Sequence, residues 1–213
     1  MQRTLEDRKG TLAYVHDSAV VAAKKAGTLT ISGFTVGDVL AAETSVMNKA
    51  SSVLPLLVFN TWKQEDQARL GYGQVQNDYK QFLKESLVEE FKRNSFYELR
   101  NNDGDVAIDV TIKKIEMSAP INQQGNFIFL LFFAAWGTQT VAGPVDVNVI
   151  ADVRASRGGA VVMEKELQGS HRTNVLKGKN AILQDYTLTM IEGMSQAVKK
   201  LNEKIVQEIN AIS

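Results

Sequence analysis

Few residues in this chain are of the types that perform chemistry, and those few are scattered. The chain of 213 residues contains no cysteine, which excludes thiolate nucleophiles, disulfides and cysteine-based zinc sites. Its two histidines, His16 and His171, lie far apart among polar residues, and the sequence specifies no carboxylates that would complete a metal site. We therefore interpret both histidines as solvated side chains, and we expect neither a metal nor another cofactor.

The acidic residues form two groups that resemble parts of known sites. Asp103, Asp105 and Asp109 resemble part of a calcium loop, but the D-x-[DN]-x-[DN]-G pattern with its distal glutamate is absent. A solvated turn in the segment NNDGD is the simpler interpretation. Glu164 and Glu166 fall on one face of a predicted strand. A paired-carboxylate site would need a second strand aimed at them, so we interpret them as solvent-facing.

Motifs that bind phosphate or activate a nucleophile are also missing. The segments GYG (71–73) and GKN (178–180) do not complete a G-x-x-x-x-G-K-[ST] phosphate loop, and the chain has no G-x-G-x-x-G or G-x-S-x-G motif. Without cysteine, and with two isolated histidines, nucleophilic catalysis has no obvious base. We expect that this protein is not an enzyme.

The composition is that of an ordinary globular protein, with 44% hydrophobic and 23% charged residues. The formal net charge is zero and no basic patch is visible, which argues against a nucleic-acid partner. The opening MQRTLEDRKG lacks the apolar region of a secretion signal, although a mature secreted protein with an added methionine would have the same sequence. No apolar stretch reaches the ~18–20 residues of a transmembrane helix.

Two long helices are predicted from apolar residues at three- and four-residue steps. The first covers residues 74–94, and the second covers residues 181–212, with a length of about 48 Å. The stripes that define them are Val75, Tyr79, Phe82, Leu83, Leu87 and Phe91 in the first helix, and Leu183, Tyr186, Met190, Met194, Ala197, Leu201, Ile205, Ile209 and Ile212 in the second.

Strands are predicted between the helices and before them. Residues 28–36 alternate loosely and form a short strand with a kink at Gly33. The apolar run VLPLLVFN (53–60) is predicted as a buried central strand, and a loop is predicted over residues 63–73. Residues 95–100 form another short strand.

The clearest strands lie between the two helices. Residues 106–117 alternate between apolar and polar side chains, and the phase changes at Lys113-Lys114, which is the pattern of a β-bulge. Residues 145–153 alternate in the same way, and the turn Arg157-Gly158-Gly159 leads into a partner strand over 161–167.

This order of elements predicts an α+β fold, with a mainly antiparallel sheet and two long helices packed on one face. Residues 1–50 are rich in small residues and are predicted to form an N-terminal extension that packs on the core. Residues 51–213 are predicted to form a single α/β sandwich domain. The sequence contains no internal repeat and no flexible linker that would separate two independent domains.

The ten consecutive apolar residues from Phe127 to Trp136 are the least ordinary part of the chain. They lack polar alternation, so both faces of such a strand would need a cover. Three interpretations remain open: a buried core strand, a surface for a partner or for self-association, and contact with a membrane interface. The candidate interaction residues are Phe127, Phe129, Phe132, Phe133 and Trp136.

The order of several segments resembles a known group of proteins. PLLVFNTW, a helix, a polar-tipped strand, an apolar segment ending in AGP, an alternating hairpin and a final amphipathic helix follow one another over residues 51–212. This order resembles the small α/β lipoproteins of Gram-negative envelopes, which include the auxiliary lipoproteins of transport systems and relatives with an anticodon-binding-like sandwich. The lipobox cysteine of that group is absent here, and Met1 would stand in its place.

The resemblance implies a protein of the periplasm, tethered at the outer membrane through an N-terminal lipid and free of catalytic residues. With the residue analysis, it predicts an accessory or structural subunit of a transport or motility assembly, which acts through protein partners or as a homo-oligomer. The alternative is a carrier of lipid or another apolar ligand, which predicts a pocket lined by the aromatic residues of 127–136. An unrecognised enzyme would instead need a cleft with a strongly perturbed titratable group.

Overall fold

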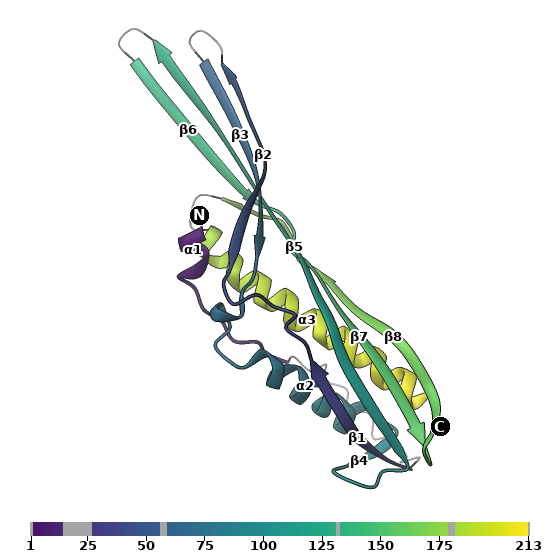
Figure 1. Ribbon diagram of the computed structural model, residues 1–213. Helices are drawn as coiled ribbons and strands as arrows, with labels where there is room; N and C mark the ends of the chain where they lie inside the picture. The colour runs from purple at the N-terminus through teal and green to yellow at the C-terminus, as the bar shows by residue number, and fades with distance from the viewer. Residues whose placement is uncertain (1, 15–26, 56–58, 131–132, 179–181, 213) are drawn as a thin grey trace.

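The computed structural model describes residues 2–14, 27–55, 59–130, 133–178 and 182–212. It has two parts, a body in which helices cover a sheet and a long arm of four strands that extends away from the body (Figure 1). The predicted α+β class, with helices on one face of the sheet, is confirmed.

The elements follow one another along the chain without a repeat. They are α1 (Gln2–Glu6), β1 (Gly27–Val36), β2 (Ser45–Pro55), β3 (Phe59–Arg69), the 3₁₀ turn η1 (Tyr72–Gln74), α2 (Tyr79–Asn94), β4 (Tyr97–Arg100), β5 (Val106–Leu130), β6 (Phe133–Ala142), β7 (Asp146–Arg157), β8 (Ala160–Arg172), β9 (Leu176–Gly178) and α3 (Ile182–Asn210).

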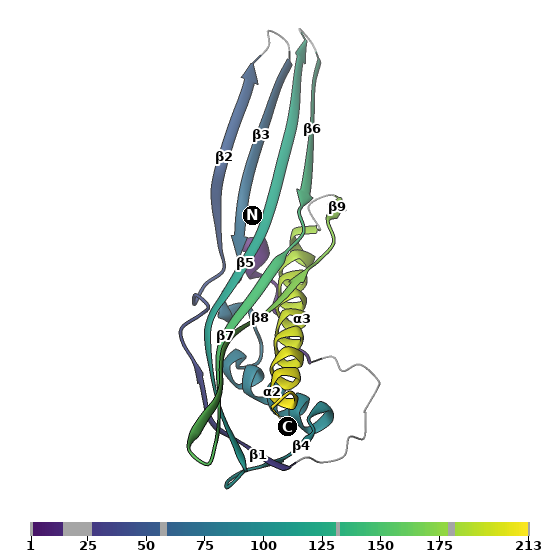
Figure 2. The same ribbon diagram turned by 90° about the vertical axis from the view of Figure 1, so that its right-hand side faces the viewer.

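Strand β5 connects the body to the arm. Its first half pairs with β1 and β7 in the body, and its second half pairs with β3 and β6 in the arm (Figure 2). The arm has the strand order β2-β3-β5-β6, and all its neighbours are antiparallel. In the body, β1 is parallel to both β4 and β5, so the described sheet is mixed rather than purely antiparallel.

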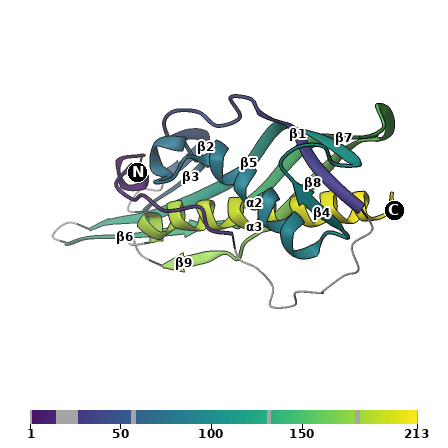
Figure 3. The same ribbon diagram turned by 90° about the horizontal axis from the view of Figure 1, so that it is seen from below.

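The two long helices pack on the same face of the body sheet. Helix α3 lies along β7 and β8, and α2 packs beside α3 (Figure 3). The predicted stripe of α3 is confirmed, because its members from Tyr186 to Ile209 are fully buried. Helix α2 begins at Tyr79 rather than at residue 74, because the Asp78 carboxylate accepts hydrogen bonds from the backbone N–H groups of Lys80 and Gln81 and caps the helix there.

Both predicted irregularities of the strands are present. The register between β1 and β5 shifts between Ile31 and Gly33, and the register between β5 and β7 shifts between Ile112 and Lys114. The bulge in β5 keeps Ile115 and the alternate residues Met117, Ala119 and Ile121 on the core face. The turn Gly158-Gly159 has positive φ at both glycines, as a tight hairpin between β7 and β8 requires.

The prediction for residues 53–73 was wrong. The run VLPLLVFN contains the end of β2 and the start of β3, and Val53 and Leu54 are 69% and 62% exposed. Residues 63–69 of the predicted loop belong to strand β3. An apolar run predicts burial only where another layer covers the strand, and the helices do not reach this part of the sheet (Figure 1).

The N-terminal region contributes to the sheet as well as packing on it. Leu5 and Leu12 are buried, and the Thr187 hydroxyl of α3 donates a hydrogen bond to the Leu5 carbonyl at 2.7 Å. Strand β1, however, lies inside the sheet between β4 and β5. The boundary expected at residue 50 falls within β2, and residues 27–36 and 45–50 are part of the sheet.

Candidate interaction surface on the arm

The core face of β5 continues from the body into the arm. Side chains alternate along a strand, so the face that carries Ile115, Ala119 and Ile121 also carries Phe127 and Phe129 further along β5. Ile121 is fully buried at the base of the arm, and Phe127 and Phe129 at its end are 38% and 57% exposed. The same strand face is therefore covered in the body and uncovered in the arm.

Neighbouring strands add apolar side chains to this uncovered face. The strand registers place Val53 beside Trp62, and Phe127 beside Trp136. Trp136 is 76% exposed. Trp62 lies over Gly125 of β5, because a Cβ at Gly125 would collide with its indole ring. We call the set Val53, Trp62, Phe127, Phe129 and Trp136 the aromatic face of the arm.

The opposite face of the arm is polar along most of its length. One row across the four strands consists of Ser52, Lys63, Gln124 and Gln139, and the Gln124 amide donates a hydrogen bond to the Gln139 side-chain oxygen at 3.0 Å. A second row includes Glu65 and Asn122. The arm is therefore a two-sided sheet with chemically distinct faces.

The end of the arm that lies away from the body carries no charged residues. Residues 50–62 and 117–145 contain no Asp, Glu, Lys or Arg. The register puts Lys63 and Glu65 closer to the body than the aromatic face. An exposed apolar surface without charge is the usual mark of an interaction site.

The base of the arm is fixed to helix α3. The buried Tyr186 hydroxyl lies 3.0 Å from the carbonyl oxygens of Pro120 and Gly143, which face each other where β5 and β6 meet the body. Burial raises the pKa of Tyr186, so the hydroxyl stays a hydrogen-bond donor. The buried Asp66 carboxylate accepts hydrogen bonds from the side-chain amides of Asn48 and Gln64, which ties β2 to β3.

The predicted interaction residues are only partly described. Phe127, Phe129 and Trp136 lie together on the aromatic face. Phe133 begins β6, and Phe132 lies outside the described residues. Sequence reasoning missed Val53 and Trp62, because their segment was predicted as a buried strand and a loop. The segments 50–62 and 117–145 both lack charged residues, and this shared feature is the sequence signal that the hairpins β2–β3 and β5–β6 belong to one arm.

The acidic groups noted in the sequence have structural partners. The Asp105 carboxylate accepts hydrogen bonds from the Thr28 backbone N–H at 2.9 Å and hydroxyl at 2.8 Å, and these bonds hold the pKa of Asp105 below its usual range. Asp109 accepts a hydrogen bond from the Ser32 hydroxyl. Glu166 is exposed and pairs with Lys113 at 2.8 Å.

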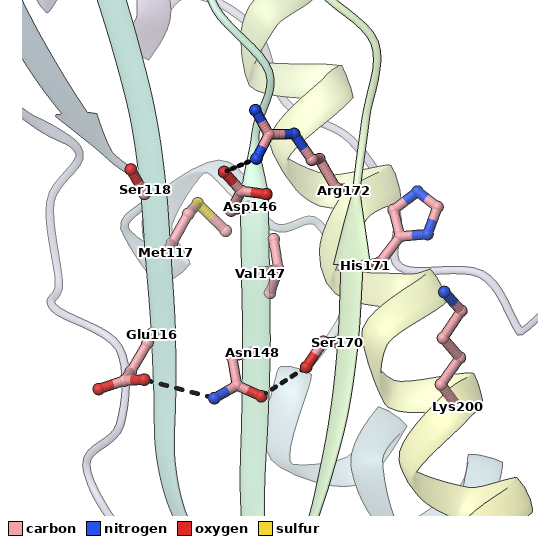
Figure 4. Close-up of a pocket in the computed structure, with 10 residues that line it drawn as sticks. All are labelled: Glu116, Met117, Ser118, Asp146, Val147, Asn148, Ser170, His171, Arg172 and Lys200. Carbon is pink, nitrogen blue, oxygen red and sulfur yellow. Dashed lines mark hydrogen bonds and ion pairs between the residues drawn. The ribbon is translucent and has the colours of Figure 1, made fainter.

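The body carries a polar cavity of about 610 Å³ on strands β5, β7 and β8, with Lys200 of α3 at its rim (Figure 4). The Ser170 hydroxyl donates a hydrogen bond to the Asn148 side-chain oxygen at 2.9 Å, and the Asn148 amide reaches Glu116 at 3.4 Å. Asp146 pairs with Arg172. The Ser170 hydroxyl is thus bonded to an amide side chain. An amide cannot accept the proton of the hydroxyl as a general base would, so Ser170 and Asn148 do not form a nucleophile–base pair.

His171 also lines this cavity, on the side of Lys200. Burial lowers the pKa of His171, and the nearby charge of Lys200 lowers it further. His16 lies outside the described residues. Within the described part of the chain, no three His, Asp or Glu side chains lie close enough together to hold a metal ion. In the same residues, no helix combines the length and apolar character that crossing a membrane requires.

The chain was compared with family models, curated proteins and solved structures. No protein-family model matches the chain, and no curated protein matches it in sequence. One similar solved structure is that of protein XCC0632 from Xanthomonas campestris, described by the family model DUF330. It is 10% identical to this chain, and the alignment covers 96% of this chain and 94% of that one with a TM-score of 0.48.

Proposed function

We propose that this protein is a non-enzymatic structural or accessory subunit of a bacterial envelope assembly, and that its arm makes the contacts. The observation that carries the proposal is the aromatic face, which continues the core face of β5 beyond the end of the helices. Burying such a surface is favourable by about 25 cal/mol per Å² of apolar area, so a partner that covers it gains affinity.

The envelope location rests on the resemblance of the segment order to envelope lipoproteins, and the assembly role rests on the arm. The body supports the arm: α3 packs along the sheet, and Tyr186 bonds it to the base of β5 and β6. A rigidly held, charge-free sheet is suited to binding another molecule, because little conformational freedom is lost when it binds.

A lipid or another apolar ligand on the same face is the second candidate. It is favoured by the two tryptophans, Trp62 and Trp136, because tryptophan is enriched where an apolar phase meets water. Four of the cavities identified among the described residues are lined mainly by polar residues, and a fifth, lined by Val39, Leu40, Leu70 and Ile115 among others, includes no residue of the aromatic face. A ligand would therefore lie on an open face rather than in an aromatic pocket.

Native electrophoresis of envelope extracts tests the proposal. We expect the wild-type chain to migrate in a complex well above its mass of 23.5 kDa. The double variant Phe129→Ser/Trp136→Ser should migrate as the free chain. The matched control Phe96→Ser/Leu188→Ser changes two side chains of the body that are 41% and 40% exposed, and it should remain in the complex.

Two results would count against the assembly role. The first is a wild-type chain that migrates alone in both envelope and soluble fractions. The second is a double variant that keeps its complex but loses bound lipid, measured by extraction and mass spectrometry, which would favour the ligand carrier.

A further inference from the structure

The outer edges of the arm differ from the outer edges of the body. Strand β8 forms one edge of the body, and its side chains include Glu164, Lys165, Glu166 and Arg172. Strand β4 forms another edge; it has only four residues, and two of them are Glu98 and Arg100. Short length and charged side chains are the usual devices by which proteins prevent edge-to-edge pairing of sheets.

Away from the body, the edges of the arm are long and free of charge, and among their described residues the one protective feature is Pro55, which ends β2 and has no N–H to donate to a neighbouring strand. Among the described residues, no strand pairs with the outer side of β2 or with β6 beyond Thr140, where β9 ends. The open part of β2 is 50–55 and the open part of β6 is 133–139, and neither contains a charged residue. The bulge of β2 lies closer to the body, between Asn48 and Ala50.

The open edges of β2 and β6 also match each other in their position along the arm and in strand direction. The strand registers place Ser52, Val53 and Leu54 of β2 level with Gln139, Thr138 and Gly137 of β6. The strands alternate in direction across the arm. The outer side of β6 in one copy would therefore meet the outer side of β2 in the next copy as an antiparallel neighbour.

From this match we propose that the arm's partner is a second copy of this chain, whose β2 pairs with β6 edge to edge. The inference rests on the proposed contact role of the arm and names its partner. Pairing in this register continues the aromatic face and the polar face across the copies, because a strand's side chains alternate with a period of two. The interface is head-to-tail, so each added copy leaves one β2 edge and one β6 edge open for the next.

Engineered disulfides test this pairing directly, because the chain has no cysteine of its own. The three variants each combine Val53→Cys with one further change, Gly137→Cys, Thr138→Cys or Gln139→Cys. Within one copy, β2 and β6 are separated by three strand spacings, about 14 Å. A disulfide needs Cα atoms within about 7 Å, so any bond must join two copies.

We expect a pattern with a period of two. The purified full-length Val53→Cys/Thr138→Cys chain should form a ladder of covalent oligomers on oxidation, seen on a non-reducing gel. The pairs with Gly137 and Gln139 put their sulfur atoms on opposite faces and should remain mainly monomeric. Val53→Cys alone should also remain monomeric, because β2 faces β6 rather than another β2.

The inference is overturned by monomers in all variants, or by equal cross-linking at 137, 138 and 139, which would indicate non-specific aggregation. These failures are distinguishable from failure of the contact role. A chain that does not cross-link but still loses its envelope complex through Phe129→Ser/Trp136→Ser uses the arm to bind a different partner. If the chain does not cross-link and Phe129→Ser/Trp136→Ser also leaves the envelope complex unchanged, the arm has no contact role.

Discussion

The substitution Trp136→Ser separates the folding role of the arm from its contact role. Trp136 is 76% exposed, so of a tryptophan surface of about 200 Å², roughly 150 Å² is available to a partner and about 50 Å² is already buried. At about 25 cal/mol per Å², these areas correspond to at most about 4 kcal/mol of association and about 1 kcal/mol of folding. In edge-to-edge pairing Trp136 lies level with Pro55 of the next copy, so only the side of the ring towards that strand is buried, and we expect self-association to weaken by about 30-fold, which corresponds to about 2 kcal/mol.

The matched control is Phe96→Ser in the body. Phe96 is 41% exposed, so about 120 Å² of a phenylalanine surface of about 200 Å² is already buried, which corresponds to about 3 kcal/mol of folding free energy. The control should therefore destabilise the fold more than Trp136→Ser does, and it should leave self-association unchanged. Trp136→Ser should weaken self-association more than Phe96→Ser does, and Phe96→Ser should lower the stability of the fold more. A general loss of stability cannot produce this opposite order.

Sedimentation equilibrium of the purified chain over a concentration series measures association, and urea unfolding followed by circular dichroism measures stability. The reasoning is refuted if Trp136→Ser changes the association constant by less than about threefold, or if Phe96→Ser weakens association as strongly. A wild-type chain that stays monomeric at high concentration would also refute self-association through the arm.

Four further predictions concern the base of the arm, the body and the location of the chain. Tyr186→Phe removes the buried hydroxyl that lies between the carbonyl oxygens of Pro120 and Gly143, while the Pro120 carbonyl keeps the Gly143 N–H as a donor at 2.8 Å; the lost hydrogen bond should lower the free energy of unfolding by about 1–3 kcal/mol in urea titrations. Gly169→Ala would drive a Cβ into the backbone of α3 at Ala197, and a loss of about 1–3 kcal/mol with a lowered Tm is expected. The pKa of His171 is lowered in the folded state, so the unfolded state binds more protons. Stability should fall as pH drops through about 6.5 towards the folded pKa, and His171→Gln should remove that part of the pH dependence in calorimetry. Intact mass spectrometry of the native protein from fractionated cells should find it in the membrane fraction with an acylated N-terminal cysteine; an unmodified methionine in the cytosol would contradict the envelope location.

The body was predictable because its elements obey local periodic rules. The stripe of α3 and the alternation of β7 each face a cover that the fold supplies, so apolar side chains indicate burial there. The bulge at Lys113-Lys114 was predictable for the same reason, because two successive polar residues break a period of two. The start of α2 was missed by five residues, since Val75 fits the helical stripe but Asp78 caps the helix after it.

The arm was not predictable by the same rules, although its signal is present. The alternation of β5 continues after the bulge through Ile115, Ala119 and Ile121, and the same parity leads to Phe127 and Phe129. Gln123 and Gly125 interrupt this apolar series, so the sequence does not show that one strand continues to Phe127 and Phe129. Nothing local distinguishes an apolar strand face that is covered by a helix from one that is left exposed, because the cover is a property of the whole fold.

The mismatch in length between sheet and helix is the physical reason for the exposed face. Strand β5 has 25 residues and extends over about 80 Å, whereas α3 has 29 residues and extends over about 44 Å. The helix cannot slide along the sheet to cover the arm, because Tyr186 is bonded to the base of β5 and β6 and Gly169 of β8 packs directly against the α3 backbone. Any cover for the aromatic face must therefore come from outside the described chain. The two charge-free edges at the same height place another arm beside this face and extend it, and the Val53 cross-linking series tests that neighbour directly.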